Sequence, residues 1–193
     1  MDWLWALALG YFLGSIPFGL VLAMAAGKGD IRQIGSGNIG ATNVLRTGSK
    51  WLAAVTLLLD LGKGYFAVWL VWQFFPLAVP VAAFGAVVGH CFPVWLRFKG
   101  GKGVATNAGV SFGLAWPIGL TYAVVWLGVL ALTRISSLAG MSSVVAAAVA
   151  AAVLGYDQFI PVLGGIAVLV IWLHRANLKR LTQGTEPRVG GKK

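Results

Sequence analysis

The chain has 193 residues, of which 59% are hydrophobic and only 10% are charged, and its mean hydropathy is +0.84. So much apolar surface excludes an ordinary soluble domain and predicts an integral membrane protein. The net charge of +10 does not indicate nucleic-acid binding, because the basic residues flank apolar runs and form no extended basic stripe. The single cysteine, Cys91, offers neither a disulfide framework nor a metal-binding spacing.

Several apolar runs along the chain approach the length of a membrane span, about 20 residues. Pro17 and three glycines are expected to bend the first run. The fourth run is too long for one span and contains Pro117, so it is predicted to form two short helices of roughly 13–17 residues, or about 20–25 Å each. In chain order, the runs cover residues 3–26, 51–75, 77–96, 104–133, 138–154 and 159–173.

The predicted fold class is all-α, a polytopic membrane helix bundle with seven helical segments that include the short broken pair around Pro117. A single transmembrane domain is expected over residues 1–181, and a loose, polar and basic C-terminal tail over residues 182–193. An alternative with five full spans and one membrane hairpin fits the same pattern of apolar runs.

The distribution of Lys and Arg predicts the orientation of the bundle. Cytoplasmic loops carry an excess of these residues. The N-terminus is therefore expected outside and the C-terminus in the cytoplasm, with the basic loops on the cytoplasmic side. The loop residues on which this orientation depends are Lys28, Arg32, Arg46, Lys50, Arg97, Lys99, Lys102 and Arg134.

The first of three glycine-rich basic clusters lies between the first two predicted spans. Gly35, Gly37 and Gly40 match the pattern G-x-G-x-x-G, but no strand precedes them, so a dinucleotide-binding fold is not predicted. Glycines let the backbone approach an anion closely, and Arg46 can pair with two phosphate oxygens. An ordinary flexible loop remains the alternative. The candidate binding residues here are Gly35, Ser36, Gly37, Asn38, Gly40, Thr42, Asn43 and Arg46.

The second cluster is a lysine surrounded by glycines at the start of a predicted helix. It resembles part of a Walker A motif, but Leu96 and Gly103 violate that pattern, so an ATPase is not predicted. Such a loop before a helix is still suited to hold a phosphate group. The alternative is a positively charged membrane anchor, which is the role expected for Arg97 and Lys99. The candidate binding residues are Gly100, Gly101, Lys102, Gly103 and Thr106.

The third cluster follows the last apolar run. His174 and Asn177 are three residues apart, so a helix would place them on one face. Arg175 and Arg180 add positive charge to the same segment. A purely structural histidine remains the alternative here, and a packing or hydrogen-bonding role is expected for the other histidine, His90.

Two charged residues, Asp60 and Lys63, lie inside the second predicted span. Charges within a membrane often mark a functional site, and an ion pair that holds helices together explains them equally well. The chain has only five acidic residues, with no carboxylate pair and no cluster that indicates a metal site. No metal or cofactor is therefore expected, and any reaction needs either no strong general base or one supplied by the substrate.

Taken in order, the three clusters resemble the three signature motifs of the bacterial acyl-phosphate:glycerol-3-phosphate acyltransferases. The resemblance covers essentially the whole chain. The H-x-x-x-x-D motif of other glycerolipid acyltransferases is missing, since Lys179 is the fifth residue after His174. The matching segments are residues 35–43 with Arg46, residues 100–106, and residues 174–181 with Gly184 and Glu186.

The resemblance implies an enzyme of the bacterial inner membrane with its active site facing the cytoplasm. The reaction would move an acyl group from acyl phosphate to the sn-1 hydroxyl of glycerol 3-phosphate, as the first acylation of phospholipid synthesis. The products would be lysophosphatidic acid and phosphate, and neither acyl-CoA nor an acyl-carrier protein would be needed. The implied catalytic residues are Ser36, Arg46, His174 and Asn177, and the glycines of the second cluster would hold glycerol 3-phosphate.

Two other functions fit parts of the sequence. The broken helices and the Asp60–Lys63 pair would suit a transporter or flippase of an anionic lipid or solute, although no internal repeat is visible. The basic loops would also suit a membrane subunit that binds anionic lipid head groups.

Overall fold

The computed structural model describes residues 1–190, and this part of the chain contains helices and no strand. The α-helices are α1 (Asp2–Gly14), α2 (Phe18–Ala25), α3 (Ala41–Leu45), α4 (Lys50–Phe74), α5 (Val79–Cys91), α6 (Val104–Leu114), α7 (Trp116–Thr133), α8 (Ser136–Val153), α9 (Ile160–Leu173) and α10 (Arg175–Thr182). Short 3-10 turns lie at η1 (Ile31–Gln33), η2 (Pro76–Ala78), η3 (Val94–Leu96) and η4 (Asp157–Phe159).

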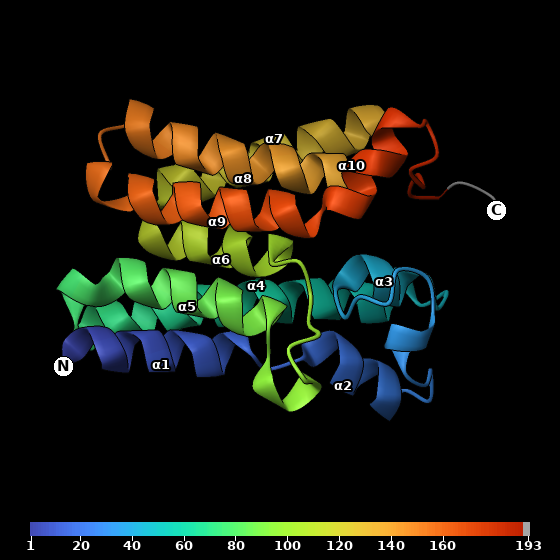
Figure 1. The fold of residues 1–193 in the computed structure, drawn as a ribbon, viewed down its shortest axis with the longest axis horizontal. Coiled ribbons are helices and arrows are strands. Elements are labelled where there is room, and N and C mark those ends of the chain that lie inside the picture. Colours follow the sequence, from blue (N-terminus) through green and yellow to red (C-terminus); the bar gives the residue numbers. More distant parts are fainter. Residues whose placement is uncertain (191–193) are drawn as a thin grey trace.

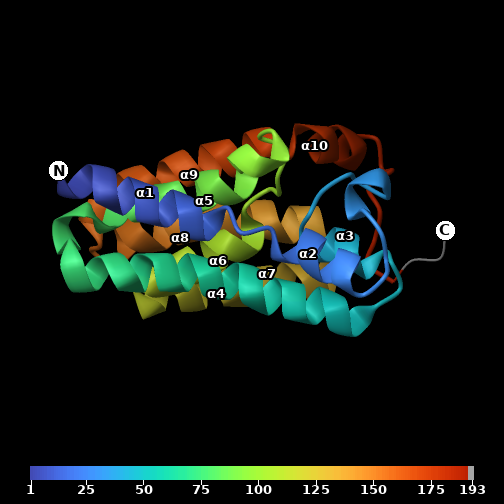
Figure 2. The same ribbon diagram turned by 90° about the horizontal axis from the view of Figure 1, so that it is seen from below.

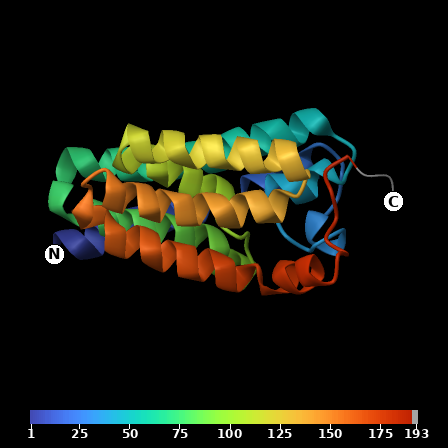
Figure 3. The ribbon, with the colours of Figure 1, turned by 90° about the horizontal axis from the view of Figure 1, so that it is seen from above.

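The long helices run side by side along one direction and form a bundle (Figure 1). The chain starts at one end of the bundle, whereas α2, α3 and α10 gather at the other end in all three views (Figures 1, 2 and 3). Within residues 1–190, five helical stretches are long and apolar enough to cross a membrane, and a sixth is the pair α9 and α10, bent by 61°. An all-α membrane bundle is therefore confirmed.

Both predicted breaks in the apolar runs are present. The first run is divided between α1 and α2, and Pro17 precedes the first residue of α2. The fourth run is divided at Ala115, which is extended, and Pro117 lies in the first turn of α7, where its missing N–H costs no hydrogen bond. Each predicted apolar segment contains a helix, while the sidedness and the number of full crossings stay predictions.

The two halves of the fourth run differ more in length than the sequence predicted. The break comes before Pro117, so α6 has only 11 residues and α7 has 18. Eleven residues make about 16 Å of helix, about half the thickness of a hydrocarbon core. The helix α6 therefore begins well inside the end of the bundle where α3 and α10 lie (Figure 1).

The described part of the C-terminal tail, residues 182–190, is not loose as predicted. The backbone N–H of Val189 donates to the carbonyl of Arg134 at 2.7 Å, and Nε of Arg134 donates back to the carbonyl of Val189 at 3.1 Å. The tail is thereby attached to the turn between α7 and α8. Residues 191–193 lie outside the described residues.

Glycines allow α1 and α5 to pack backbone against backbone. A Cβ atom on Gly10 would lie 2.3 Å from the carbonyl oxygen of Ala82, and one on Gly14 would lie 2.0 Å from that of Ala86. Lipid chains are as apolar as the helices, so close van der Waals packing of this kind holds membrane helices together. These glycines therefore fix α5, whose C-terminal end leads into the second cluster.

Replacing Gly14 with alanine should force α1 away from α5, because the new methyl group would meet backbone atoms that cannot rotate aside. We expect Gly14→Ala to lower stability by about 1–3 kcal/mol, measured as a lower thermal unfolding midpoint in detergent. Gly164→Ala in α9 is the matched control, since nothing lies within 4 Å of its Cβ position. An unchanged midpoint for Gly14→Ala would contradict this packing.

Candidate active site

The three clusters predicted from the sequence meet at one end of the bundle. The first surrounds α3, the second is the loop that leads into α6, and the third is α10 with the residue before it (Figure 1). A direct contact joins the second and third clusters: Lys102 donates a hydrogen bond to Oδ1 of Asn177. In the first cluster, the hydroxyl of Thr42 shares a hydrogen bond at 3.0 Å with that of Ser136, the first residue of α8. The site thus combines segments far apart in the sequence.

Asn43 holds the loop of the first cluster together through hydrogen bonds from its side chain. It is buried, and its amide nitrogen donates to the carbonyls of Ile31 at 2.7 Å and Ile34 at 3.2 Å. Its Oδ1 accepts from the backbone N–H of Ser36 at 3.1 Å and from Nη1 of Arg46 at 3.2 Å. Asn43 therefore shapes the loop and offers no free amide proton, while the exposed Ser36 and Arg46 lie at its rim.

Two further residues explain the course of this loop. Gly35 has a positive φ of 57°, and a Cβ there would lie 2.4 Å from Oδ1 of Asn43 and 2.8 Å from Nη1 of Arg46, so only glycine fits. Oδ1 of Asn38 accepts the N–H of Gly40 at 2.8 Å, which leads the chain into α3. Gly37 lies at the open side of the loop, also at positive φ.

The second cluster folds back onto the end of α5. The N–H of Gly100 donates to the carbonyl of Cys91, and that of Gly101 donates to the carbonyl of His90, both at 3.0 Å. Gly103, at φ 82°, directly precedes α6. Of the five candidates in this cluster, only Lys102 forms a hydrogen bond with a residue of another cluster.

Thr106 is not brought to the open part of the site. Its side chain is fully buried. Its backbone lies against Gly64 of α4, where a Cβ atom on the glycine would come within 2.2 Å of the carbonyl oxygen of Thr106. The structure therefore places Thr106 in the contact between α6 and α4, beneath the glycine loop.

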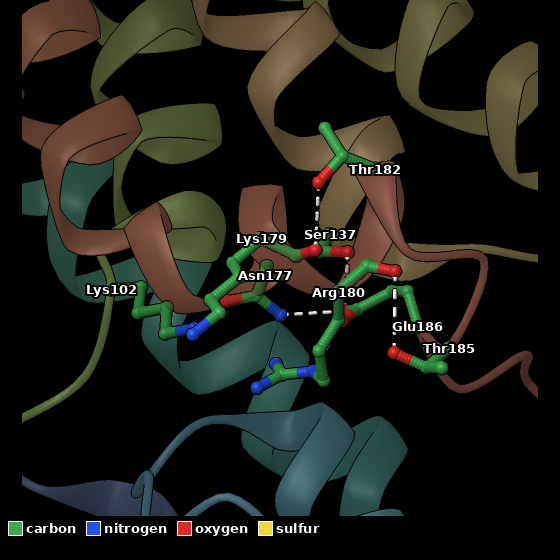
Figure 4. A network of polar contacts seen from close by, with 8 residues as sticks. All are labelled: Lys102, Ser137, Asn177, Lys179, Arg180, Thr182, Thr185 and Glu186. Atoms are coloured by element: carbon green, nitrogen blue, oxygen red, sulfur yellow. Dashed lines mark hydrogen bonds and ion pairs between the residues drawn. The ribbon is translucent and has the colours of Figure 1, made fainter.

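A chain of polar contacts joins the second and third clusters (Figure 4). Asn177 lies between Lys102, which donates to its Oδ1, and Glu186, whose Oε1 accepts from its Nδ2 at 2.6 Å. The hydroxyl of Ser137 also donates to Oε1 of Glu186 at 2.6 Å, and Nε of Arg180 donates to Oε2 at 2.7 Å. Because a cation lies on one side and a carboxylate on the other, the orientation of the Asn177 amide is fixed.

Positive charge dominates this end of the molecule. Burial is the largest cause that lowers the pKa of Lys102, and the nearby charge of Arg180 lowers it further, to about 8. Arg46 and Arg175 act in the same direction from the two other clusters, and Glu186 acts against them. Burial raises the pKa of Glu186, but hydrogen bonds from Ser137, Asn177 and Arg180 outweigh it and leave the pKa below its usual value.

His174 is buried at the joint between α9 and α10. Its Nδ1 lies 2.7 Å from the carbonyl oxygen of Val170. A carbonyl only accepts, so Nδ1 carries the proton and Nε2 presents its lone pair. Burial lowers the pKa of His174 to about 4, despite the hydrogen bond to Val170. The imidazole is therefore neutral near pH 7, and its ring is bonded to α9, with no hydrogen bond to Asn177.

Three residues of the site were given no role from the sequence: Ser136, Ser137 and Glu186. The two serines begin α8, directly after Ile135 and close to the basic Arg134, on the end of the bundle that carries the other clusters. Polar residues at the start of a predicted span, close to the basic Arg134, were the available signal. Glu186 is the only glutamate of the chain and lies in an otherwise basic tail, which also set it apart. Within residues 1–190, no group of His, Cys, Asp and Glu is arranged to hold a metal ion.

An apolar groove of about 170 Å³ lies beside the second cluster, between α4, α6 and α7. It is lined by Val104 and Ala105, which directly follow the glycine loop, and by the aromatic residues Phe112, Tyr122 and Trp126. Tyr122 supports its wall with a hydrogen bond from its hydroxyl to the carbonyl of Val104 at 2.8 Å. The polar site thus borders a surface suited to a hydrocarbon chain.

Comparison with known proteins agrees with the sequence motifs. Residues 4–184 match the family model described as glycerol-3-phosphate acyltransferase. The chain is 67% identical over 187 residues to a glycerol-3-phosphate acyltransferase of Erythrobacter litoralis, covering 97% of this chain and 95% of the relative. The corresponding protein of Novosphingobium aromaticivorans is 66% identical with the same coverage, and that of Paramagnetospirillum magneticum is 57% identical over 95% of this chain and 92% of the relative.

The fold also matches solved structures. The crystal structure of PlsY, an integral membrane glycerol 3-phosphate acyltransferase, in its glycerol 3-phosphate form aligns with a TM-score of 0.93 at 36% identity, over 98% of this chain and 96% of that chain. The lysophosphatidic acid form aligns with a TM-score of 0.90 at the same identity and coverage. The resemblance inferred from the three motifs is confirmed, and the transporter and lipid-binding alternatives give way to an enzyme: the chain belongs to the glycerol-3-phosphate acyltransferase family and is an integral membrane acyltransferase.

Proposed function

We propose that the enzyme transfers a fatty acyl group from acyl phosphate to the sn-1 hydroxyl of glycerol 3-phosphate, giving lysophosphatidic acid and inorganic phosphate. One observation carries this proposal: three basic clusters converge beside an apolar groove. Both substrates bear a phosphate group and one bears a hydrocarbon chain. The relatives and the solved PlsY structures named for glycerol 3-phosphate and lysophosphatidic acid support the acceptor and the product.

The charges of the site suit two phosphate groups. Arg46 and Ser36 lie together at the rim of the first loop, held by the same oxygen of Asn43. Lys102 and Arg180 lie on the other side, with Arg175 near enough to lower the pKa of Lys102. A phosphate monoester carries about −1.5 to −2 charges near pH 7, so each phosphate needs more than one cation. We assign the glycine loop with Lys102 to glycerol 3-phosphate and Arg46 to the donor phosphate.

The proposed reaction needs no strong base from the protein. The sn-1 hydroxyl oxygen attacks the acyl carbonyl carbon, and the bond from this carbon to the phosphate oxygen breaks. Acyl phosphate is a mixed anhydride, so the phosphate leaves readily, and an oxygen of the departing phosphate takes the hydroxyl proton. The neutral Nε2 of His174 can accept a hydrogen bond from the other hydroxyl of glycerol 3-phosphate and thereby orient this substrate, while the sn-1 proton goes to the phosphate. No acyl-carrier protein and no metal ion enters this scheme.

Charge that develops on the carbonyl oxygen needs hydrogen-bond donors fixed in place before the reaction. The second amide proton of Asn177 and the hydroxyl of Ser36 are the donors that we propose. Asn177 is suited to this role because its orientation is fixed by Lys102 and Glu186. The acyl chain would lie in the groove along α6, and the active site would face the cytoplasm from the inner membrane, as the basic loops favour.

An assay of phosphate release tests the function directly. Purified enzyme should release phosphate only when acyl phosphate and glycerol 3-phosphate are both present, with lysophosphatidic acid formed in equal amount. Acyl-CoA and acyl-carrier protein carrying the same acyl chain should not replace acyl phosphate. Transfer from either of these donors at a comparable rate would refute the proposed donor. Transport of substrate without transfer would refute the enzyme reaction.

Arg46→Lys should be far from a conservative change. Lysine keeps the charge but loses the planar fork that holds two phosphate oxygens. Losing one charge-assisted hydrogen bond should cost about 1.5–3 kcal/mol, or roughly ten- to a hundredfold in kcat/KM. The exposed Arg97 provides the control, because Arg97→Lys should leave the rate unchanged. Near-normal activity of a folded Arg46→Lys enzyme would show that another residue binds the donor phosphate.

The pH dependence should reflect Lys102. Its pKa of about 8 means that the ammonium form is present below this pH and is lost above it. We expect kcat/KM for glycerol 3-phosphate to fall as the pH rises through about 8. In Lys102→Arg the fall should move upward by more than about one pH unit, because arginine keeps its proton. Lys99→Arg should not move the profile, and an unmoved profile in Lys102→Arg would exclude Lys102 as the titrating group.

A further inference from the structure

A further group of polar residues, none of them part of the three motifs, lies inside the bundle. It consists of Asp60 and Lys63 on α4 and His90 on α5, with side chains only 2%, 3% and 3% exposed. Nζ of Lys63 lies 2.6 Å from Oδ1 of Asp60, and Nδ1 of His90 lies 3.7 Å from the same oxygen. Removing such groups from water is costly even when they are paired, so ionisable residues inside a membrane bundle often have a functional role.

Lys63 attaches this cluster to the break in the first span. Its Nζ donates to the carbonyl of Ile16 at 2.7 Å, and it lies 5.7 Å from the centre of the Phe18 ring. Because the helix is interrupted before Pro17, backbone carbonyls there lose the N–H donors that a continuous helix would provide. Inside a membrane these carbonyls need another donor. Lys63 therefore holds the joint between α1 and α2 against α4.

His90 attaches the same cluster to the glycine loop. Its carbonyl accepts the N–H of Gly101 at 3.0 Å, and its ring fills the space beside that glycine. A Cβ on Gly101 would lie only 1.9 Å from Nε2 of the ring. The next residue is Lys102, which contacts Asn177, so the ring of His90 supports the backbone from which the site lysine extends. The break after α1, the end of α5 and the start of α6 lie at about the same level along the bundle (Figures 1 and 2).

We infer that Asp60, Lys63 and His90 are positioning residues for glycerol 3-phosphate, which set the glycine loop through the contact of His90 with Gly101. This inference rests on the proposed function, since the loop is assigned to that substrate. An ion pair that merely joined helices would act on stability alone. Because the His90 ring packs against Gly101, a change in the Asp60–Lys63 pair should also change how the glycine loop binds glycerol 3-phosphate.

A double-mutant cycle tests the contact between ring and loop. In Gly101→Ala the new methyl group would strike the imidazole, so KM for glycerol 3-phosphate should rise about tenfold, with KM for acyl phosphate unchanged. In the His90→Ala background the obstacle is gone, so adding Gly101→Ala should raise KM much less. Gly100→Ala is the matched control, because its methyl group would meet the backbone carbonyl of His90, 2.2 Å away, which His90→Ala retains.

The role of the Asp60–Lys63 ion pair is tested by a double variant whose side chains have nearly the same shape but no charge. Asp60→Asn with Lys63→Met removes both charges at once and leaves no lone charge buried. We expect a higher KM for glycerol 3-phosphate and an unchanged KM for acyl phosphate. Thr56→Val is the control on the same helix, since Thr56 is equally buried but bonds only within α4, to the carbonyl of Leu52. It should change neither KM.

Hydrogen exchange provides a measurement that does not require activity. The amides of Gly100 and Gly101 are bonded to the end of α5, so exchange of the segment 97–103 should be faster in His90→Ala and in the Asp60→Asn, Lys63→Met variant, but not in Thr56→Val. Wild-type exchange in both variants, or equal effects of Gly101→Ala with and without His90, would overturn the inference. A wild-type enzyme without transfer activity would instead refute the proposed function, and exchange would still decide the role of the cluster.

Discussion

The contact of Asn177 with Lys102 on one side and Glu186 on the other is the interaction on which the site depends. Four basic residues from three clusters lie close enough to raise one another's electrostatic energy, which contributes to the low pKa of Lys102. Glu186 is the carboxylate that offsets this repulsion, and it binds Ser137, Asn177 and Arg180 together. This carboxylate holds Arg180 directly and Lys102 through Asn177, so these two cations are already in place before an anion binds.

The site also depends on interrupted helices. A continuous helix satisfies its own backbone, whereas each interruption releases groups that need partners inside the membrane. At the break after α1, side chains supply them: Trp95 donates to the carbonyl of Ser15 at 2.9 Å, and Lys63 donates to that of Ile16. The carbonyls released at this break therefore have partners inside the bundle, so the chain can be interrupted there without leaving them unpaired.

The fold class and the three clusters could be predicted from the sequence, because apolar length, prolines and basic loops are local signals. The roles of single residues could not. Asn43 looked like a donor to substrate, but its amide protons are used by the carbonyls of Ile31 and Ile34. Thr106 looked like part of a phosphate loop, but helix α6 turns it toward α4. The tail was expected to be loose, because nothing near Glu186 in the sequence reveals its partners. Such roles depend on which distant segments meet.

The shortness of α6 has a consequence for traffic through the enzyme. Because α6 begins partway along the bundle, the glycine loop is set back from the end where α3 and α10 gather (Figure 1), and the apolar groove is lined by the residues that directly follow this loop. In the proposed reaction, a water-soluble reactant would approach from that end of the bundle, whereas a reactant with a long tail would approach sideways from the lipid. Each would stay in its own solvent until the reacting atoms meet. An amphipathic product would then leave sideways into the lipid, along the groove.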